Sequence, residues 1–230
     1  MMFSATWPEE IRELAQKYLK SPVKVTIGSD DLSACNRVTQ IVEIVDQRDK
    51  DRKLEQLLRK YHDRKNRILI FCLYKKEAAR VESSLARKGW NVCGIHGDMG
   101  QNQRTDAFQK FKSGTVPLLV ATDVAARGLD IPNVEYVINY TFPLTIEDYI
   151  HRIGRTGRAT KTGIAHTFFT ILEKTKGGDL CKVLRDANQV VPPELEKFGP
   201  SIKKKKSHDL YGTAYEAPAT MKAATRIKFD

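Results

Sequence analysis

The chain of 230 residues lacks the features that would place it in a membrane, outside the cell or around a structural metal. No apolar run approaches the roughly 20 residues that a bilayer-spanning helix needs, and no segment resembles a secretory signal. The four cysteines are scattered, without a CxxC pair, which argues against a disulfide framework and a metal site. No GxGxxG follows the first strand-like segment, which excludes a dinucleotide-binding oxidoreductase. We therefore expect no bound metal and no membrane association.

Positive charge is in clear excess. The 39 lysines and arginines against 28 aspartates and glutamates give a formal net charge of +11. Such an excess favours a polyanionic partner, and nucleic acid is the first candidate. An anionic membrane surface and simple solubility are the alternatives. A hydrophobic content of 41% is typical of a globular domain with a sizeable core.

Apolar segments alternate with amphipathic segments along most of the chain. Strand-like segments occur at 38–45, 67–73, 91–95, 117–121, 136–140 and 164–171, and the segment 67–73 is a continuous apolar run of the kind found in strands buried on both faces. Apolar residues at helical spacing occur at 54–61, 78–85, 101–112, 145–153 and 179–187. This alternation predicts an α/β fold in which a parallel sheet is covered by helices on both faces. Because ligands of such sheets collect at the carboxyl ends of the strands, the loops after Leu73, Ile95, Ala121 and Tyr140 are candidate binding sites.

The two ends of the chain depart from this pattern. The start predicts a helix after Pro8 and a short alternating strand at 23–27. The end holds closely spaced prolines, the lysine run 203–206 and no periodicity, so we expect a basic, mostly disordered tail. Nucleic-acid contact, nuclear import and simple solubility are alternative roles for that lysine run. The chain thus divides into four segments, at 1–28, 29–36, 37–190 and 191–230.

One stretch, 145–158 (TIEDYIHRIGRTGR), combines an anchored helix with basic side chains. Thr145 suits the start of a helix, and apolar residues then recur at helical spacing, which predicts one buried face. Gly154 ends the helix. The pattern predicts that His151 and Arg152 project away from the apolar face.

Two further arginines, Arg155 and Arg158, follow this helix. The small Thr156 and Gly157 leave room between them for a group that contacts both guanidinium groups. Rigidly placed guanidinium groups bind phosphate oxygens and can stabilise the charge that develops in phosphoryl transfer. A surface cluster of salt bridges is the alternative interpretation of so short a motif.

The loop after Ile95 carries polar residues suited to a nucleic-acid backbone. Gly97 permits close approach of a ligand, and Gln101 and Arg104 share one face of the next helix, where they offer donors to a phosphodiester. Lys75, after the apolar run 67–73, is placed to attract phosphate. A capped helix start with solvated side chains is the alternative in both places.

The loop after Ala121 carries a second set of polar residues. Thr122 and the amides beside it suit a backbone phosphate, and Asp130 is an acceptor for ribose hydroxyls, as acidic residues are in other nucleotide-binding folds. Arg127 lies between them, and we expect it to pair with a nearby carboxylate.

Together these motifs resemble the second RecA-like domain of the DEAD-box RNA helicases. The resemblance rests on four ordered strings, which are SAT at 4–6, IHGDMGQNQR at 95–104, ATDVAARGLDIP at 121–132 and HRIGRTGR at 151–158. It covers the chain from Met1 to about Ala187. It implies a RecA-like fold and ATP as the cofactor. It also implies an RNA partner that is held by its backbone with little sequence specificity.

The resemblance also implies roles for individual residues. Three residues match catalytic positions of the family: Arg155 and Arg158 match the arginine fingers that reach the γ-phosphate, and His151 matches a residue that links this domain to the motifs of the other. Those that match ATP-binding positions are Gly128, Asp130, Arg155 and Arg158. Those that match RNA-binding positions are Gly97, Gln101, Arg104, Thr122, Asp123 and Lys75. Those that match positions coupling the nucleotide to RNA are Ser4, Ala5, Thr6 and Arg152.

The sequence departs from the family pattern in two respects. The family usually has Thr before Lys75, and this chain has Tyr74. The chain also contains no GxxxxGK[ST] and no Asp-Glu-Ala-Asp, the elements that cradle the phosphates and hold Mg²⁺. We therefore interpret residues 1–28 as the remnant of a missing N-terminal RecA-like domain, which would hold the Mg²⁺, and we expect the chain alone to be inactive towards ATP.

These observations predict the C-terminal half of an ATP-dependent RNA helicase. A stand-alone, non-catalytic RNA-binding or scaffold module is the alternative. The string FCLYKKEAARVE and the lysine-rich tail are similar to a nucleolar subgroup that acts in ribosome assembly. That similarity implies pre-ribosomal proteins as partners of a monomeric protein in the nucleus, specifically the nucleolus, with the cytoplasm as the alternative.

Overall fold

The computed structural model describes residues 2, 9–25, 37–63, 66–127, 129, 131, 134–158 and 161–198, with the backbone of 206–208 and 212–214. Five residues with predicted roles lie outside the described residues, which are Ser4, Ala5, Thr6, Gly128 and Asp130. Within the described part of the chain, no helix is long and apolar enough to cross a bilayer.

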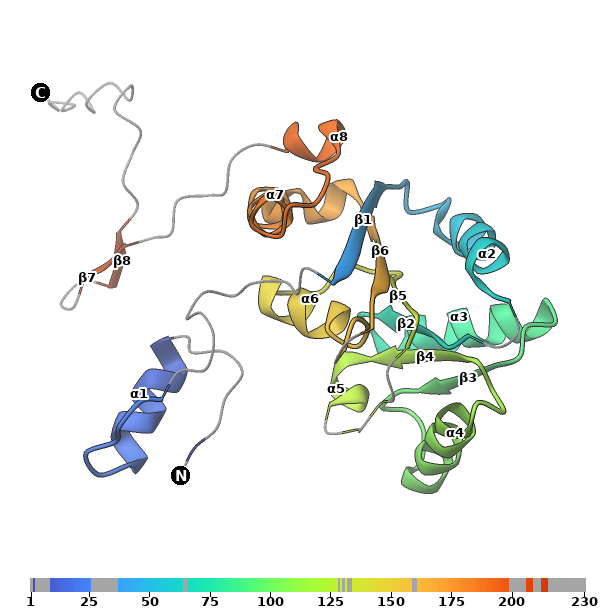
Figure 1. Ribbon diagram of the computed structural model, residues 1–230, viewed down its shortest axis with the longest axis horizontal. Helices are drawn as coiled ribbons and strands as arrows, with labels where there is room; N and C mark the ends of the chain where they lie inside the picture. The colour runs from blue at the N-terminus through green and yellow to red at the C-terminus, as the bar shows by residue number, and fades with distance from the viewer. Residues whose placement is uncertain are drawn as a thin grey trace, which may run out of the picture.

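Six parallel strands form the central sheet, as the sequence predicts (Figure 1). Their order across the sheet is β1-β6-β5-β2-β4-β3. Their bounds are β1 Val38–Ile44, β2 Ile68–Cys72, β3 Val92–Ile95, β4 Leu118–Thr122, β5 Tyr136–Asn139 and β6 Gly163–Phe169. Three of the four inner strands, β5, β2 and β4, are almost entirely buried, which explains their largely apolar sequences.

Helices cover both faces of the sheet, because alternate strand side chains point to opposite faces. In β2, Ile68, Ile70 and Cys72 belong to one apolar cluster, whereas Leu69 and Phe71 belong to the other. The first cluster is completed by α2 Lys50–Tyr61 and α3 Lys75–Arg87. The second is completed by α4 Gln101–Ser113, α5 Asp123–Ala126, α6 Ile146–Ile153, α7 Gly177–Asp186 and α8 Pro193–Glu196. The fold is therefore the three-layer α/β arrangement expected from the sequence.

The register of the strands brings the predicted binding loops to one edge. Ile95 pairs with Ala121, Ala121 with Phe71, and Phe71 with Asn139. These four residues therefore stand level across β3, β4, β2 and β5, near the carboxyl ends of the strands. The loops that follow these strands leave the sheet at this carboxyl edge, as predicted.

The predictions for the first segment hold only in part. The helix after Pro8 is confirmed as α1 Glu9–Tyr18, which lies apart from the sheet in Figure 1. The alternating strand is wrong for its described part, because residues 22–25 form no strand and the side chains of Val23 and Val25 are exposed. An alternating pattern becomes a strand only where another strand pairs with it, and no described strand lies beside this segment.

Part of the predicted tail is ordered structure. Residues 193–196 form α8, whose Leu195 side chain is fully buried in the cluster that also contains α7. The Phe198 ring lies 5.7 Å from the ring of Phe169, at the end of β6. Packing against the sheet therefore continues to residue 198, beyond the boundary drawn at 190. Further on, β7 Lys206–His208 pairs with β8 Gly212–Ala214 in an antiparallel hairpin.

Truncation of Leu195 tests this boundary. We expect Leu195→Ala to lower the free energy of unfolding by about 2–5 kcal/mol, because it leaves a cavity in the core. Val190→Ala is the matched control, since its side chain is 83% exposed and such changes stay within about 0.5 kcal/mol. Urea unfolding measures both, and equal losses for the two variants would contradict the packing of 191–198.

Candidate functional site

The loops after β2 and β3 meet at the carboxyl edge. Lys75, the first residue of α3, forms an ion pair with Asp98, with 2.6 Å between Nζ and Oδ1. The Lys75 ammonium lowers the pKa of the Asp98 carboxyl group. Gly97 is exposed beside this pair, and a Cβ atom on it would lie 3.8 Å from Cδ of Lys75. The Lys75 side chain remains more than half exposed, so it can still face an anion.

Helix α4 places two of the predicted contacts next to this loop. The Gln103 side chain accepts a hydrogen bond from the backbone N–H of Gly100, which fixes the start of the helix. Gln101 is exposed, and Arg104 is one turn further along the same face. The Nε atom of Arg104 is buried and has no hydrogen-bond partner among the described residues. The exposed Gln101 side chain and the partly exposed Arg104 side chain thus lie next to each other on this face of α4.

Arg152 is the main departure from the sequence prediction. Its side chain was expected to project from α6 but is only 1% exposed. Nε and Nη2 donate to the two carboxylate oxygens of Asp123, at 2.7 and 2.6 Å, and Nη1 donates to the backbone oxygen of Thr141 at 2.6 Å. The guanidinium carbon lies 5.1 Å from the centre of the Phe71 ring. A buried cation needs such partners, and α6 supplies the cation to the loops after β4 and β5.

The hydrogen bonds of Arg152 continue to the loop after β2. The Thr141 hydroxyl donates to Oε2 of Glu77 at 2.7 Å, and the same oxygen accepts from the backbone N–H of Leu73 at 3.2 Å. Arg152 also lies 3.4 Å from Oδ1 of Asn139. Sequence reasoning missed Glu77, Asn139 and Thr141. Only Asn139 gave a signal, as a polar residue within an apolar strand.

The structure also places Thr122, Arg127, Tyr74 and His151, and it confirms the expected pairing of Arg127. The Thr122 side chain makes no capping hydrogen bond at the start of α5, and the residue is 6% exposed. Arg127 pairs with the carboxylate of Asp148 at 2.8 Å, as expected. The Tyr74 side chain is 64% exposed between α3 and β2. His151 projects from α6 to the exterior, as predicted.

Arg155 and Arg158 form a separate group, which we call the arginine loop (residues 154–158). The Arg155 side chain is half-buried and makes no hydrogen bond or ion pair with any described residue. Burial, together with the nearby charge of Arg158, lowers the pKa of Arg155, although an arginine stays protonated at neutral pH. Arg158 donates to the backbone oxygens of Gly154 and Ile131, at 2.9 and 3.1 Å. These bonds fix the guanidinium group of Arg158, whose charge acts on Arg155.

The small residues within the arginine loop serve to anchor it, rather than to leave room as predicted. Thr156 is buried, and its hydroxyl donates to the backbone oxygen of Val134 at 2.5 Å. Gly157 has a φ of +68°, and a Cβ atom there would lie 2.6 Å from Cγ2 of Val38. Glycine is therefore required at this position both by backbone conformation and by space.

The arginine loop does not lie at the carboxyl edge. Helix α6 begins there, with the Thr145 side chain accepting from the N–H of Asp148, and runs back antiparallel to the strands. At its other end the backbone oxygen of Arg155 accepts from Val134, just before β5. An eight-residue helix spans about 12 Å. The rule about carboxyl ends thus finds the first group of residues but misses the arginines.

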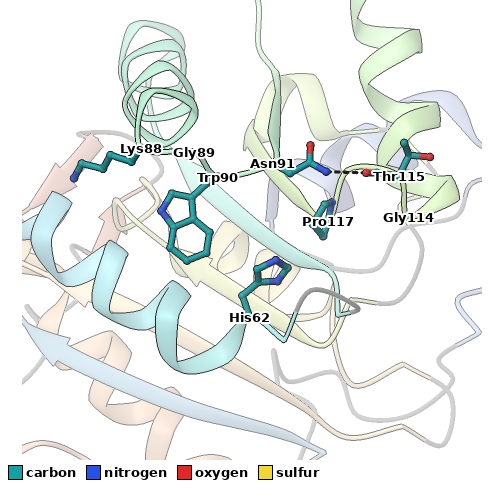
Figure 2. Close-up of a pocket in the computed structure, with 8 residues that line it drawn as sticks. All are labelled: His62, Lys88, Gly89, Trp90, Asn91, Gly114, Thr115 and Pro117. Carbon is teal, nitrogen blue, oxygen red and sulfur yellow. Dashed lines mark hydrogen bonds between the residues drawn. The ribbon is translucent and has the colours of Figure 1, made fainter.

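One cavity lies away from both groups. It has a volume of about 530 Å³ and is lined by His62, Lys88, Gly89, Trp90, Asn91, Gly114, Thr115 and Pro117 (Figure 2). These residues precede β3 and β4 or follow α2, α3 and α4, so the cavity opens at the amino edge of the sheet. None of the predicted site residues lines it.

Comparisons with known proteins agree with these motifs. The family model described as "Helicase conserved C-terminal domain" matches residues 49–160. The ATP-dependent RNA helicase DBP3 of Candida albicans is 59% identical over the whole chain, which covers 41% of that relative. The chain thus spans about two fifths of the length of this curated relative.

Solved structures give the same result. The crystal structure of the yeast DEAD-box splicing factor Prp28 is 34% identical, with a TM-score of 0.67 over 91% of this chain and 47% of that one. The Escherichia coli DEAD-box protein SrmB, crystallised with regulator of ribonuclease activity A, is 33% identical, with a TM-score of 0.56 over 68% of this chain and 92% of that one.

Removal of Arg152 alone should strongly destabilise the fold. We expect Arg152→Gln to lower the free energy of unfolding by about 3–5 kcal/mol, because it leaves a largely buried carboxylate unpaired. The matched control is Arg127→Gln, which removes the exposed pair with Asp148 and should cost about 1 kcal/mol or less. Urea unfolding of both variants checks this, and similar losses would contradict the structural importance of Arg152.

Proposed function

The chain belongs to the DEAD-box RNA helicases and contains their helicase C-terminal domain, and from this membership we propose that it is the half of such an enzyme that holds the RNA backbone and completes the ATP site. The observation that carries the proposal is Arg155, a half-buried guanidinium without a partner among the described residues, beside Arg158. A buried cation of this kind is stabilised by an anion, and a triphosphate offers one.

We propose that RNA lies along the carboxyl edge. Gln101 and Arg104 on α4, Lys75 on α3 and the Thr122 hydroxyl offer donors to successive phosphates, with Gly97 allowing close approach. The Asp123 carboxylate would repel phosphate and is already bound by Arg152. We therefore assign Asp123 a positioning role and its neighbour Thr122 the direct contact. Contacts to the backbone alone imply little sequence specificity.

ATP would meet the arginine loop when an N-terminal RecA-like domain docks. Arg155 and Arg158 would then stabilise the charge that develops on the γ-phosphate, and His151 would contact that domain. By the family resemblance, Gly128 and Asp130 would contact the ribose and 4–6 would transmit the nucleotide state. By the same resemblance, the nucleotide's Mg²⁺ would be held by the docking domain.

Helix α6 is the proposed link between the two ligands. Its buried Arg152 binds the carboxylate of Asp123, the residue after Thr122, and the same helix leads directly into Arg155 and Arg158. If ATP displaced the arginine loop, α6 would therefore transmit the displacement to the residues at the carboxyl edge. Such coupling would let hydrolysis release the RNA after a short duplex has been locally unpaired.

We also propose a setting for this activity. The lysine run 203–206 and the string FCLYKKEAARVE support action on pre-ribosomal RNA in the nucleolus, with pre-ribosomal proteins as partners and the helicase itself as a monomer. A fluorescent fusion of the full protein tests the location. Exclusion from the nucleolus would contradict it without bearing on the RNA and ATP sites.

The arginine pair can be tested in a chimaera that joins the N-terminal domain of the Candida albicans relative to this chain. We expect RNA-stimulated ATP hydrolysis, and a loss of about 10³–10⁵ in kcat for Arg155→Ala or Arg158→Ala, with little change in RNA affinity. Lys161→Ala, an exposed position close to the arginine loop, is the control. Weaker RNA binding with normal turnover would instead favour the stand-alone RNA-binding module.

The chain by itself should fold, bind RNA weakly and release no phosphate from ATP. The reason is that it lacks the phosphate-binding loop and the acidic box, while it keeps the donors at the carboxyl edge. Fluorescence anisotropy with a labelled single-stranded RNA measures binding, which we expect Gln101→Ala combined with Arg104→Ala to weaken. ATP turnover by the chain that disappears in Arg155→Ala would refute the expectation.

A further inference from the structure

The cavity at the amino edge has no role in the proposed function. It lies where α2, α3 and α4 end, since His62, Lys88 and Gly114 are the residues that cap their carboxyl ends. The register places Val92, Leu118 and Ile68 level at the first residues of β3, β4 and β2. The cavity is thus separated from the RNA-binding loops by the length of the strands.

Its walls suit an aromatic side chain. The rings of Trp90 and His62 lie 5.9 Å apart at an angle of 55°, and Pro117 adds an apolar wall (Figure 2). The volume of about 530 Å³ is enough for one large side chain and part of its backbone. Asn91, which donates to the backbone oxygen of Thr115 at 2.9 Å, gives the rim a polar group that can bind a peptide backbone. Aromatic anchors in pockets of this kind dominate many protein interfaces.

The surroundings of the cavity favour negative charge in the ligand. None of the eight lining residues is acidic, and Lys88 is one of them, although its ammonium also contacts Glu55 at 2.7 Å. The Arg67 guanidinium packs against Gly114, where a Cβ atom would lie 3.3 Å from it, and its Nε atom is buried without a hydrogen-bond partner in the described part of the chain. The last turns of the three helices that end here are also basic, with Arg59, Lys60, Arg87, Lys110 and Lys112, although Arg59 and Lys110 already pair with Glu55 and Asp106.

We propose that this cavity is a docking site for a partner protein, which inserts an aromatic side chain flanked by acidic residues. The aromatic side chain would lie against Trp90 and His62, and its acidic neighbours would face Lys88 and Arg67. A peptide fits better than RNA, because the cavity is an open hollow with room for one side chain beside Trp90 and His62, whereas the donors suited to phosphate line the opposite edge. The proposal does not depend on ATP or RNA binding.

A phage library of random short peptides, selected against the purified chain, tests this. We expect the enriched peptides to share an aromatic residue flanked by Asp or Glu. Binding of the synthetic peptide should weaken about tenfold or more in Trp90→Ala, in accord with the loss of an aromatic anchor contact. Lys88→Glu and Thr115→Trp, which fills the cavity mouth from an exposed position, should also weaken it, and they keep the test valid if Trp90→Ala does not fold.

Lys174→Glu is the matched charge reversal, because Lys174 is exposed on the 3-10 helix 171–176, at the carboxyl end of β6. It should leave peptide binding unchanged. The proposal is overturned if no peptide is enriched, if the enriched peptides lack the aromatic and acidic pattern, or if Thr115→Trp and Lys88→Glu bind them normally. A labelled single-stranded RNA whose affinity falls in these two variants but not in Lys174→Glu would assign the cavity to nucleic acid and would equally overturn it.

Discussion

The ion pair between Arg152 and Asp123 is the contact on which the rest of the site depends. Both groups lose most of their water in the folded protein, and the pair compensates only because the geometry is bidentate and Thr141 supplies a further acceptor. Its value lies in position rather than in net stability. It fixes the loops after β4 and β5 against one helix, and through Glu77 the loop after β2 as well.

The direction of α6 would allow one short helix to serve both proposed ligands. A crossover helix returns antiparallel to the strands it joins, so its first turn lies at the carboxyl edge and its last turn near the amino edge. The residues proposed for RNA lie near the first turn, and Arg155 and Arg158 follow the last. A signal between them needs no long pathway, because Arg152 lies on the same helix and contacts the loop that is proposed to bind RNA. What such a signal requires is that the ligands bind differently to two positions of this helix.

The sequence could predict the layers and most elements because patterns of period two and 3.6 reflect burial directly. It also identified the loops after Ile95 and Ala121, since a parallel sheet brings carboxyl ends together. It could not predict that Arg152 is buried, because whether an arginine points inward depends on a carboxylate that lies 29 positions away in the chain. The prediction of a strand at 23–27 was wrong for a similar reason, because a strand forms only where a neighbouring strand pairs with it. Leu195 was missed because a single turn of helix carries no periodic signal.

The hydrogen-bond partners of Arg152 and Arg155 distinguish a structural charge from one that is available to a ligand. Arg152 and Arg155 are three residues apart and both withdrawn from water, yet the first has three protein acceptors and the second has none among the described residues. Burial without a partner lowers the pKa of Arg155 and therefore destabilises the folded chain. The packing of Thr156 and Gly157 holds the loop in place despite that cost. A fold that keeps a cation unpaired at a rigid position favours any anion that can reach it, and this is how affinity for a triphosphate would arise from the stability of the domain itself.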